Sequence, residues 1–226
     1  LSAAVDNQGS IQAELGTVVL ASGEKMTFAL DDMNDISVVI DEGVKTEVFG
    51  LNGEKITSAV KNSGTISANG GKIILTAKVL NNVFDYAVNN TGVIEAKNII
   101  EHDGVIELTA EGGPVINTGR IEAGEVKIDV KDSGFINKGD MISEGIIEVK
   151  APNIDLFDIG SVISDFKITL DADTVKITYS SGKSPFTLDP DSLVDVTTGA
   201  ILQAPEVRVI AKKLGTIDAP LSINAK

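Results

Sequence analysis

Residues 88–96, Val-Asn-Asn-Thr-Gly-Val-Ile-Glu-Ala, contain the pattern that decides the fold. Its alternate positions hold an apolar residue, asparagine, glycine, an apolar residue and a small residue. Four further segments repeat this pattern, beginning at Val5, Val60, Val115 and Phe135. Five matches with one internal spacing indicate a repeat protein. The paired asparagine and glycine positions are Asn7 and Gly9, Asn62 and Gly64, Asn90 and Gly92, Asn117 and Gly119, and Asn137 and Gly139.

Each match is followed by a strand-like run, such as Lys72–Thr76 or Val126–Val130. After a first gap of 55 residues, the motif asparagines recur about every 20 to 28 residues, an interval typical of solenoids. The runs are rich in β-branched residues, which argues against a helical repeat. We therefore predict an all-β fold, a parallel β-helix in which one chain forms every coil.

In-register coils lie about 4.8 Å apart, so equivalent positions stack into columns. We predict one inward column from Val5, Val60, Val88 and Val115, and a second from Ile11, Ile66, Ile94 and Ile121. The asparagines should hydrogen-bond within their turns and along the axis, as in cross-β stacks. The motif glycines should adopt turn conformations that a Cβ would disfavour. These residues are predicted to be structural.

The pattern also predicts how the chain is organised. We expect a single β-helix domain over residues 1–226, with regular repeats over 1–150 and degenerate coils over 151–226. At about 24 residues per coil this gives roughly nine coils. The first gap should hold two coils, or one coil and a small insertion outside the helix near residues 25–54. Residues 79–87 lack alternation and predict a short helix.

Charge and composition narrow the possible partners. The 226 residues include 33 acidic and 19 basic side chains, for a formal net charge of −14. Such a surface repels phosphate backbones and anionic lipid, so we expect no nucleic acid partner. Without cysteine there are no disulfides or thiolate metal sites. No apolar run reaches about 18 residues, so we expect no membrane insertion.

The candidate metal site is an acidic group in the expected insertion, at Asp31, Asp32, Asn34 and Asp35. Calcium prefers such oxygen ligands, but the spacing does not match an EF-hand loop. A solvated loop is the favoured reading, so we expect no cofactor, with calcium here as the single candidate.

The remaining polar candidates favour structural readings. His102 is the only histidine, and one histidine cannot form a histidine cluster or a catalytic triad without partners. Asp189 and Asp191 flank a proline in an expected turn. Asn89 begins a formal glycosylation sequon, a short motif that carries little weight on its own.

Parallel β-helices also include polysaccharide lyases and glycosidases, which need two carboxylates on one face. With two tyrosines and no tryptophan, this chain offers few platforms for sugar rings. The expected outward carboxylates are spread along the rod as on a solvated face, and we predict no catalytic residues. They are Glu95, Glu107, Glu122, Glu125 and Glu148.

Most of residues 1–145 resembles the haemagglutination-activity region of filamentous haemagglutinins, the large exoproteins of bacterial two-partner secretion. The resemblance implies a right-handed parallel β-helix and a secreted adhesin, toxin carrier or haemolysin. It implies no particular receptor. The similar stretches are 5–13, 18–25, 36–42, 62–68, 70–78, 88–96 and, near the end, 214–223.

Together, the repeat and the resemblance predict a secreted or cell-surface structural and adhesive rod, not an enzyme. Its expected partners are a host or surface receptor or glycan and, for the parent protein, an outer-membrane transporter. No basic and apolar leader opens the chain, so we expect a piece of a larger precursor. The alternative is a subunit of an extracellular filament or surface layer that stacks end to end. A polysaccharide-active enzyme ranks third.

Overall fold

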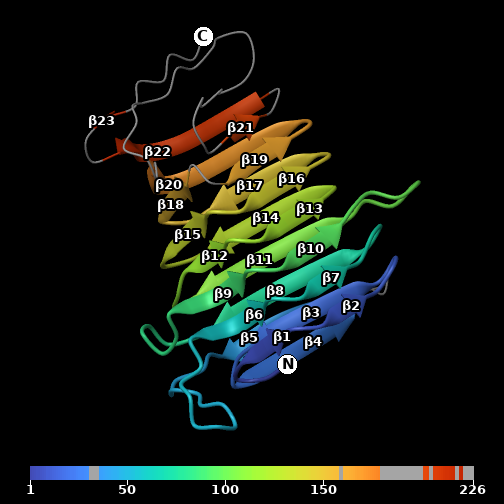
Figure 1. Cartoon of the computed structure of the whole chain (residues 1–226), viewed down its shortest axis with the longest axis vertical. Helices are drawn as coiled ribbons and strands as arrows, with labels where there is room; N and C mark the ends of the chain where they lie inside the picture. The colour runs from blue at the N-terminus through green and yellow to red at the C-terminus, as the bar shows by residue number, and fades with distance from the viewer. Residues whose placement is uncertain (31–35, 158–159, 179–200, 204–205, 217–218, 221–226) are drawn as a thin grey trace.

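The computed structural model describes residues 1–30, 36–157, 160–178, 201–203, 206–216 and 219–220. Within these residues the chain is all-β, without helix, and winds as a parallel solenoid from β1 at one end to β22 at the other (Figure 1). The predicted parallel β-helix is therefore confirmed.

Each coil contributes strands to three faces, which are joined by three corners whose lengths differ between coils. The first face holds β1 (Val5–Asn7), β6 (Ser58–Asn62), β9 (Tyr86–Asn90), β12 (Val115–Asn117), β15 (Gly134–Asn137) and β18 (Asn153–Phe157). The second face holds β2 (Ser10–Gln12), β7 (Thr65–Ser67), β10 (Val93–Ala96), β13 (Arg120–Ala123), β16 (Asp140–Ser143), β19 (Ser161–Ser164) and β21 (Ile201–Gln203). The third face holds β3 (Thr17–Ser22), β8 (Lys72–Lys78), β11 (Val105–Glu111), β14 (Glu125–Val130), β17 (Ile146–Lys150), β20 (Lys167–Thr178) and β22 (Glu206–Thr216).

The strand β20 changes the shape of the last coils. Over its 12 residues it pairs first with β17 on the third face and then with β18 on the first face. The corner between these two faces is therefore absent here, and their strands form one continuous 14-stranded sheet. At the end of the described chain, β23 (Ala219–Pro220) pairs antiparallel with β22.

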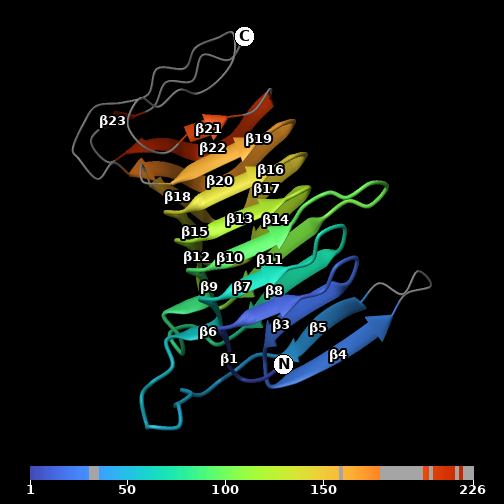
Figure 2. The same ribbon diagram turned by 45° about the vertical axis from the view of Figure 1, so that its right-hand side comes forward.

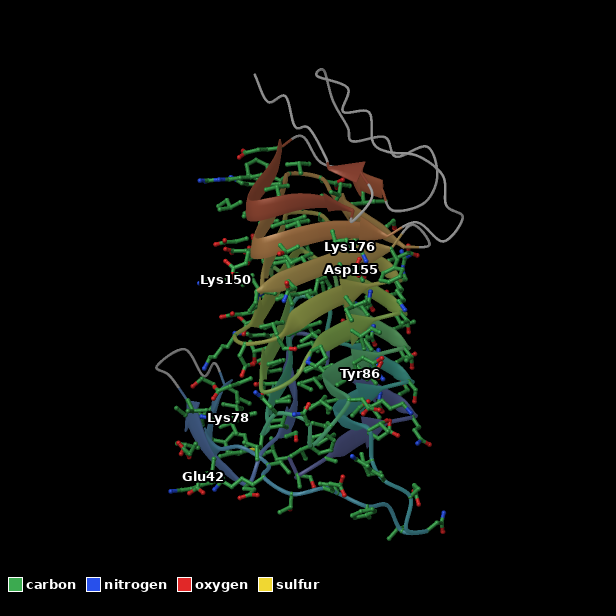
Figure 3. The ribbon with its side chains drawn as sticks, turned by 90° about the vertical axis from the view of Figure 1, so that its left-hand side faces the viewer. Glu42, Lys78, Tyr86, Lys150, Asp155 and Lys176 are labelled. Atoms are coloured by element: carbon green, nitrogen blue, oxygen red, sulfur yellow. The ribbon has the colours of Figure 1, made fainter. Side chains whose placement is uncertain are left out.

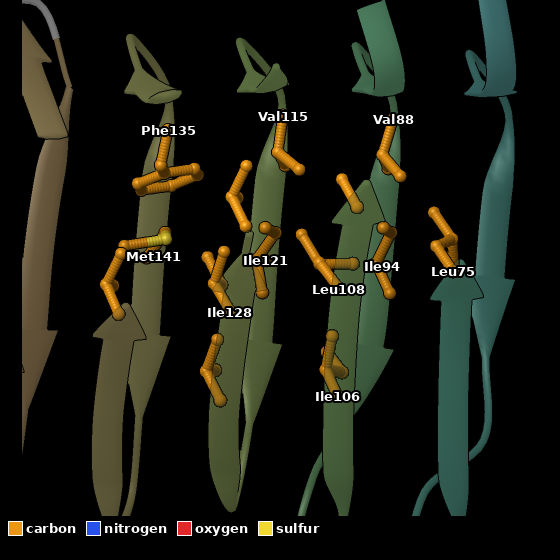
Figure 4. Close-up of a cluster of buried hydrophobic side chains, with 14 of the residues drawn as sticks. Leu75, Val88, Ile94, Ile106, Leu108, Val115, Ile121, Ile128, Phe135 and Met141 are labelled. Atoms are coloured by element: carbon orange, nitrogen blue, oxygen red, sulfur yellow. The ribbon is translucent and has the colours of Figure 1, made fainter. Parts of the chain in front are cut away.

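The predicted apolar columns are confirmed by the strand registers. Val60 lies opposite both Val5 and Val88, and Ile94 lies opposite both Ile66 and Ile121. Apart from the members in the first coil, these side chains are fully buried. Figure 4 shows Val88, Val115, Ile94 and Ile121 in the interior between the strands. Burying each such side chain contributes roughly 1.5–3 kcal/mol. The third face adds two further columns, which pass through Ile73, Ile106 and Val126 and through Leu75, Leu108 and Ile128.

The motif asparagines form one directed chain of hydrogen bonds through the interior. Each Nδ2 donates to the Oδ1 of the asparagine one coil further on, with 2.8 Å at every step. The chain runs from Asn7 through Asn62, Asn90 and Asn117 to Asn137, where Nδ2 turns to the carbonyl oxygen of Gly139 at 2.8 Å. The next position on this column is Leu156. The predicted axial asparagine stack is thus confirmed.

The motif glycines are required for a reason other than the predicted one. Their φ angles are not positive, so their turns do not need a left-handed residue. A Cβ on Gly92 would instead collide with the carbonyl oxygen of Gly64 in the previous coil, and Gly119 stands in the same relation to Gly92. Gly9, in the first coil, has open space at that position. Close stacking of backbones therefore excludes a side chain.

The first gap holds one coil and an insertion outside the helix. The strands β4 (Lys25–Leu30) and β5 (Ile36–Glu42) form an antiparallel hairpin that leaves the rod beside β3 (Figure 2). The chain leaves the third face after Ser22, which pairs with Ala77, and returns at Val44, which pairs with Val79. The insertion therefore interrupts the rung without shifting its register.

The prediction of a short helix over residues 79–87 is wrong. The segment is a corner loop, and Tyr86 already begins β9. Val83 and Phe84 are consecutive residues that both enter the core, with 6% and 4% exposure. This placement breaks the two-residue alternation of a strand without producing a helix.

Long corners are confined to the first three coils of the described chain. The corner between the third and first faces spans 43–57 and 79–85 in the first two coils, then 112–114, 131–133 and 151–152. The corner between the second and third faces spans 13–16, 68–71 and 97–104, then 124, 144–145 and 165–166. The described residues form seven coils, and the nine predicted for the whole chain also count residues outside the described ranges.

The asparagine chain predicts a stability test at its centre. Asn90→Ala should lower the free energy of unfolding by about 2–4 kcal/mol, because it removes the acceptor of Asn62 and the donor to Asn117 in a dry interior. Asn90→Asp should cost more at pH 7 than at pH 4, because burial disfavours the charged carboxylate. Urea titration followed by circular dichroism measures both, with the half-buried Asn89→Ala as the control. Equal midpoints for Asn90→Ala and Asn89→Ala would contradict a stabilising role for the chain.

Candidate interaction surface

The outward residues stack in register in the same way as the inward ones, so charges on neighbouring coils face one another. On the third face, Lys72 Nζ lies 3.0 Å from Glu107, and Lys78 and Lys131 lie 3.4 and 2.9 Å from Glu111. On the first face, Lys176 reaches Asp155 at 3.8 Å from the adjacent coil, as Figure 3 shows. The flat faces of the rod are thus locally neutralised despite the overall negative charge.

The densest charge cluster lies on the second face. Lys97 Nζ is 3.2 Å from Glu95 and 3.1 Å from Glu122, and Arg120 is 2.7 Å from Glu122. Burial raises the pKa of Glu122, but hydrogen bonds from Arg120 and Lys97 outweigh it and hold the pKa below its ordinary value. The hydrogen bonds to Glu122 and Glu95 raise the pKa of Lys97.

The carboxylates singled out by sequence do not gather as one group. Glu95 and Glu122 are neighbours on the second face, joined through Lys97. The other three lie on the third face, where Glu107 pairs with Lys72, Glu125 pairs with Lys127 at 3.0 Å, and Glu148 is exposed. Four of the five carboxylates therefore belong to salt bridges that are distributed along the rod.

The structure places some of the other polar candidates. His102 is exposed and pairs through its backbone with Ile99 in a projecting turn. Asn89 donates to Ser58 Oγ at 3.2 Å. Within the described ranges, no three histidine, aspartate or glutamate side chains come together to hold a metal ion. The calcium candidates Asp31, Asp32, Asn34 and Asp35, and the pair Asp189 and Asp191, lie outside the described residues.

Surface grooves follow the third face. One, of about 680 Å³, passes Asp129, Lys150 and Asp171, which occupy the same outward column on successive coils. Another, of about 380 Å³, lies between Val38 and Ile40 of the hairpin and the outer side of β8 and β11. Both combine stacked polar residues with aliphatic walls and are open to solvent.

Sequence analysis missed the exposed apolar side chains of the early coils. Most of the exposed large apolar residues described belong to the first 100 residues, at the N-terminus, on the hairpin or on corners: Leu1, Leu15, Phe28, Leu30, Val39, Phe49, Leu51, Leu80, Ile99 and Ile100. The adjacent isoleucines at 99 and 100 were the available signal, because they lie between polar residues without strand alternation. The candidate interaction surface is therefore formed by the first three coils, which carry the hairpin, the long corners and most of these apolar side chains.

The charge cluster predicts a pH-dependent stability difference. Glu122→Gln should lower the free energy of unfolding by about 0.5–1 kcal/mol at pH 7. Because folding lowers the pKa of Glu122, this difference should persist down to its ordinary value of 4.5 and vanish as the pH falls through the folded pKa. Urea midpoints between pH 3 and pH 7 measure it, with Glu148→Gln as a charge-matched control. A difference that stays constant to pH 3 would contradict this account.

No helix in the described part of the chain has the length and apolar character needed to cross a membrane.

Comparison with known proteins yields a partial similarity. Over 109 residues, 48% of this chain, the sequence is 33% identical to a heme/hemopexin-binding protein of Haemophilus influenzae. The chain spans 10% of the length of that relative. No family model and no solved structure matches the sequence. The strand registers therefore carry the fold assignment, and the relative adds a likeness to part of a much longer binding protein.

Proposed function

We propose that this chain is a segment of a secreted or cell-surface exoprotein of the filamentous haemagglutinin type, in which the solenoid is a rod that carries adhesive loops. The parallel β-helix is compatible with such a shaft. The partial likeness to a heme/hemopexin-binding protein supports a binding rather than a purely structural role. Export of the parent protein through an outer-membrane transporter belongs to the same proposal.

The observation that carries the proposal is the contrast between the two parts of the described rod. The coils from Val115 to Asp171 have minimal corners, whereas the first three coils carry the hairpin, the long corners and most of the exposed apolar residues. In solenoids, insertions of this kind map to loops that often form the binding face. A rod that served only as a spacer would not need the exposed apolar side chains of Phe28, Leu51 and Ile100.

The distribution of carboxylates supports a non-catalytic role. Hydrolysis of glycosides requires two carboxyl groups at a working distance across the substrate. Here each of Glu107, Glu122 and Glu125 forms a salt bridge with a lysine or an arginine. These carboxylates are also spread over two faces of the rod. We therefore assign them to stability and solubility.

The proposal predicts that adhesion depends on the insertions. In a smooth-rod variant, residues 24–43 are removed so that Gly23 joins Val44 at the rung the insertion interrupts, and residues 97–103 are removed so that Ala96 joins Gly104. The second junction reproduces the Ala123–Gly124 corner of the next coil. Beads coated with the full chain should be retained on epithelial monolayers or on immobilised heme-loaded hemopexin about tenfold more than beads coated with the smooth rod.

The smooth rod must first show an unchanged strand spectrum by circular dichroism, which makes it a folded control. Beads coated with albumin give the background retention. Equal retention of the full chain and the smooth rod, or retention of neither above albumin, would contradict adhesion through the insertions.

End-to-end stacking into a filament is a second candidate, favoured by the first coil. In the described residues β1 and β2 each pair along one edge only, with β6 and β7, and the outer edge of β3 is covered only at its last residues, by Ser2. Val5 and Ile11 at this end are only partly buried. Unpaired parallel edges are templates for strand addition.

If this end recruits a second copy, sedimentation velocity should show a mass that rises with concentration. Lys substituted for Ile11 should abolish that rise, because it would place a charge against the neighbouring apolar column. A single sedimenting species at every concentration would contradict stacking.

A further inference from the structure

One corner of the rod directs apolar side chains into solvent. It lies between the second and third faces, where Leu15 is 58% exposed, Ile99 39% and Ile100 88%. Ile99 and His102 exchange backbone hydrogen bonds of 2.9 and 2.8 Å, which leaves Ile100 at the tip of a tight turn. Figure 2 shows this loop, in green between β10 and β11, extending well beyond the neighbouring turns.

The exposed residues form one patch across three coils. Leu15 lies at the corner of the first coil, Gly70 at the same place in the second, and Ile99 in the third. A methyl group on Gly70 would come within 2.8 Å of Leu15 Cδ2 and 3.1 Å of Ile99 Cδ1. The two side chains therefore flank Gly70 from both sides, and we call Leu15, Ile99 and Ile100 the apolar corner.

The backbone at this corner is strained. Three non-glycine residues in the described chain have positive φ, namely Leu15 at 56°, Asn82 at 68° and Glu101 at 67°. Asparagine tolerates this region, whereas leucine and glutamate do so at a cost in free energy. Gly70 meets the same requirement without strain, at a φ of 65°. The fold alone would favour glycine at position 15, so the leucine side chain is present at a cost in folding free energy.

Acidic residues border the apolar corner. Glu14 precedes Leu15, while Glu101 and Asp103 flank the tip, and all three are exposed. Because the chain has a net charge of −14 and these carboxylates lie at the corner, a second copy of this chain or an anionic lipid surface would be repelled from the corner. A projecting tip also fits a concave surface better than a flat one.

We propose that the apolar corner is an interaction surface for a partner protein segment that presents aromatic or aliphatic residues beside lysine or arginine. Burial of Leu15, Ile99 and Ile100 would supply the contact, and the acidic border would steer and orient the partner. This inference rests on the proposed function, because it assigns the adhesive contact to one corner.

The test uses the full chain and a phage-displayed library of random dodecapeptides as the probe. Selection should enrich peptides in which aromatic or aliphatic residues stand beside lysine or arginine. Their affinity should fall about tenfold or more for Leu15→Gly and for Ile100→Asn, and it should weaken with added salt. The matched control is Leu51→Asn, a fully exposed leucine on the other long corner.

A stability measurement separates contact from folding. Leu15→Gly should unfold at the same or a higher urea concentration than the unchanged chain, because it relieves strain while removing the contact. Loss of stability in this variant, peptides that bind Leu15→Gly and Ile100→Asn as well as the unchanged chain, or no enrichment would overturn the proposal. Bead adhesion that survives in both variants would overturn this corner alone and leave the adhesive rod standing.

Discussion

In-register stacking of one coil on the next is the constraint on which the whole molecule depends. A side chain at a given position meets its counterparts about 4.8 Å above and below. The side chains of one column must therefore be able to pack against, or hydrogen-bond to, their neighbours in the same column. Aliphatic columns satisfy this requirement by packing, and the asparagine column satisfies it by passing a hydrogen bond from each amide to the next. The glycines follow from the same constraint, because the backbones at the motif turn leave no space for a Cβ.

Stacking also shapes the surface that a partner would meet. Outward columns place lysines against carboxylates on adjacent coils, as with Lys72 and Glu107, so the faces satisfy their own charges. The long corners are free of this requirement where they extend past the coil above. Apolar area and strained backbone can therefore accumulate there, and in the described chain they do so in the first three coils.

The features that recur were predictable from sequence, and those that occur once were not. The columns through Val60 and Ile66 and the asparagine chain followed from spacing alone, because a repeat reports the same environment several times. The reason for glycine at position 92 could not be predicted from sequence, because a turn conformation and a close approach of backbones both select glycine. The helix expected at 79–87 failed because Val83 and Phe84 fill the core from a loop, a packing effect that no periodicity reveals. The apolar corner was missed for a similar reason, since it unites Leu15 with Ile99 from coils 84 residues apart in the sequence.

The asparagine column has one more consequence, which concerns direction. All its side-chain amide dipoles point the same way along the axis, so the column has a dipole direction in addition to the direction of the chain. At one end Asn7 Oδ1 holds a 3.3 Å bond from the N–H of Gly9 and faces the edge of the first coil, while at the other end Leu156 succeeds Asn137. A coil placed before the first one would have to bring a proton donor to the Asn7 rung, whereas beyond Asn137 the chain itself continues the column with Leu156 and then Ile177. The two ends of the asparagine column thus have chemically different neighbours.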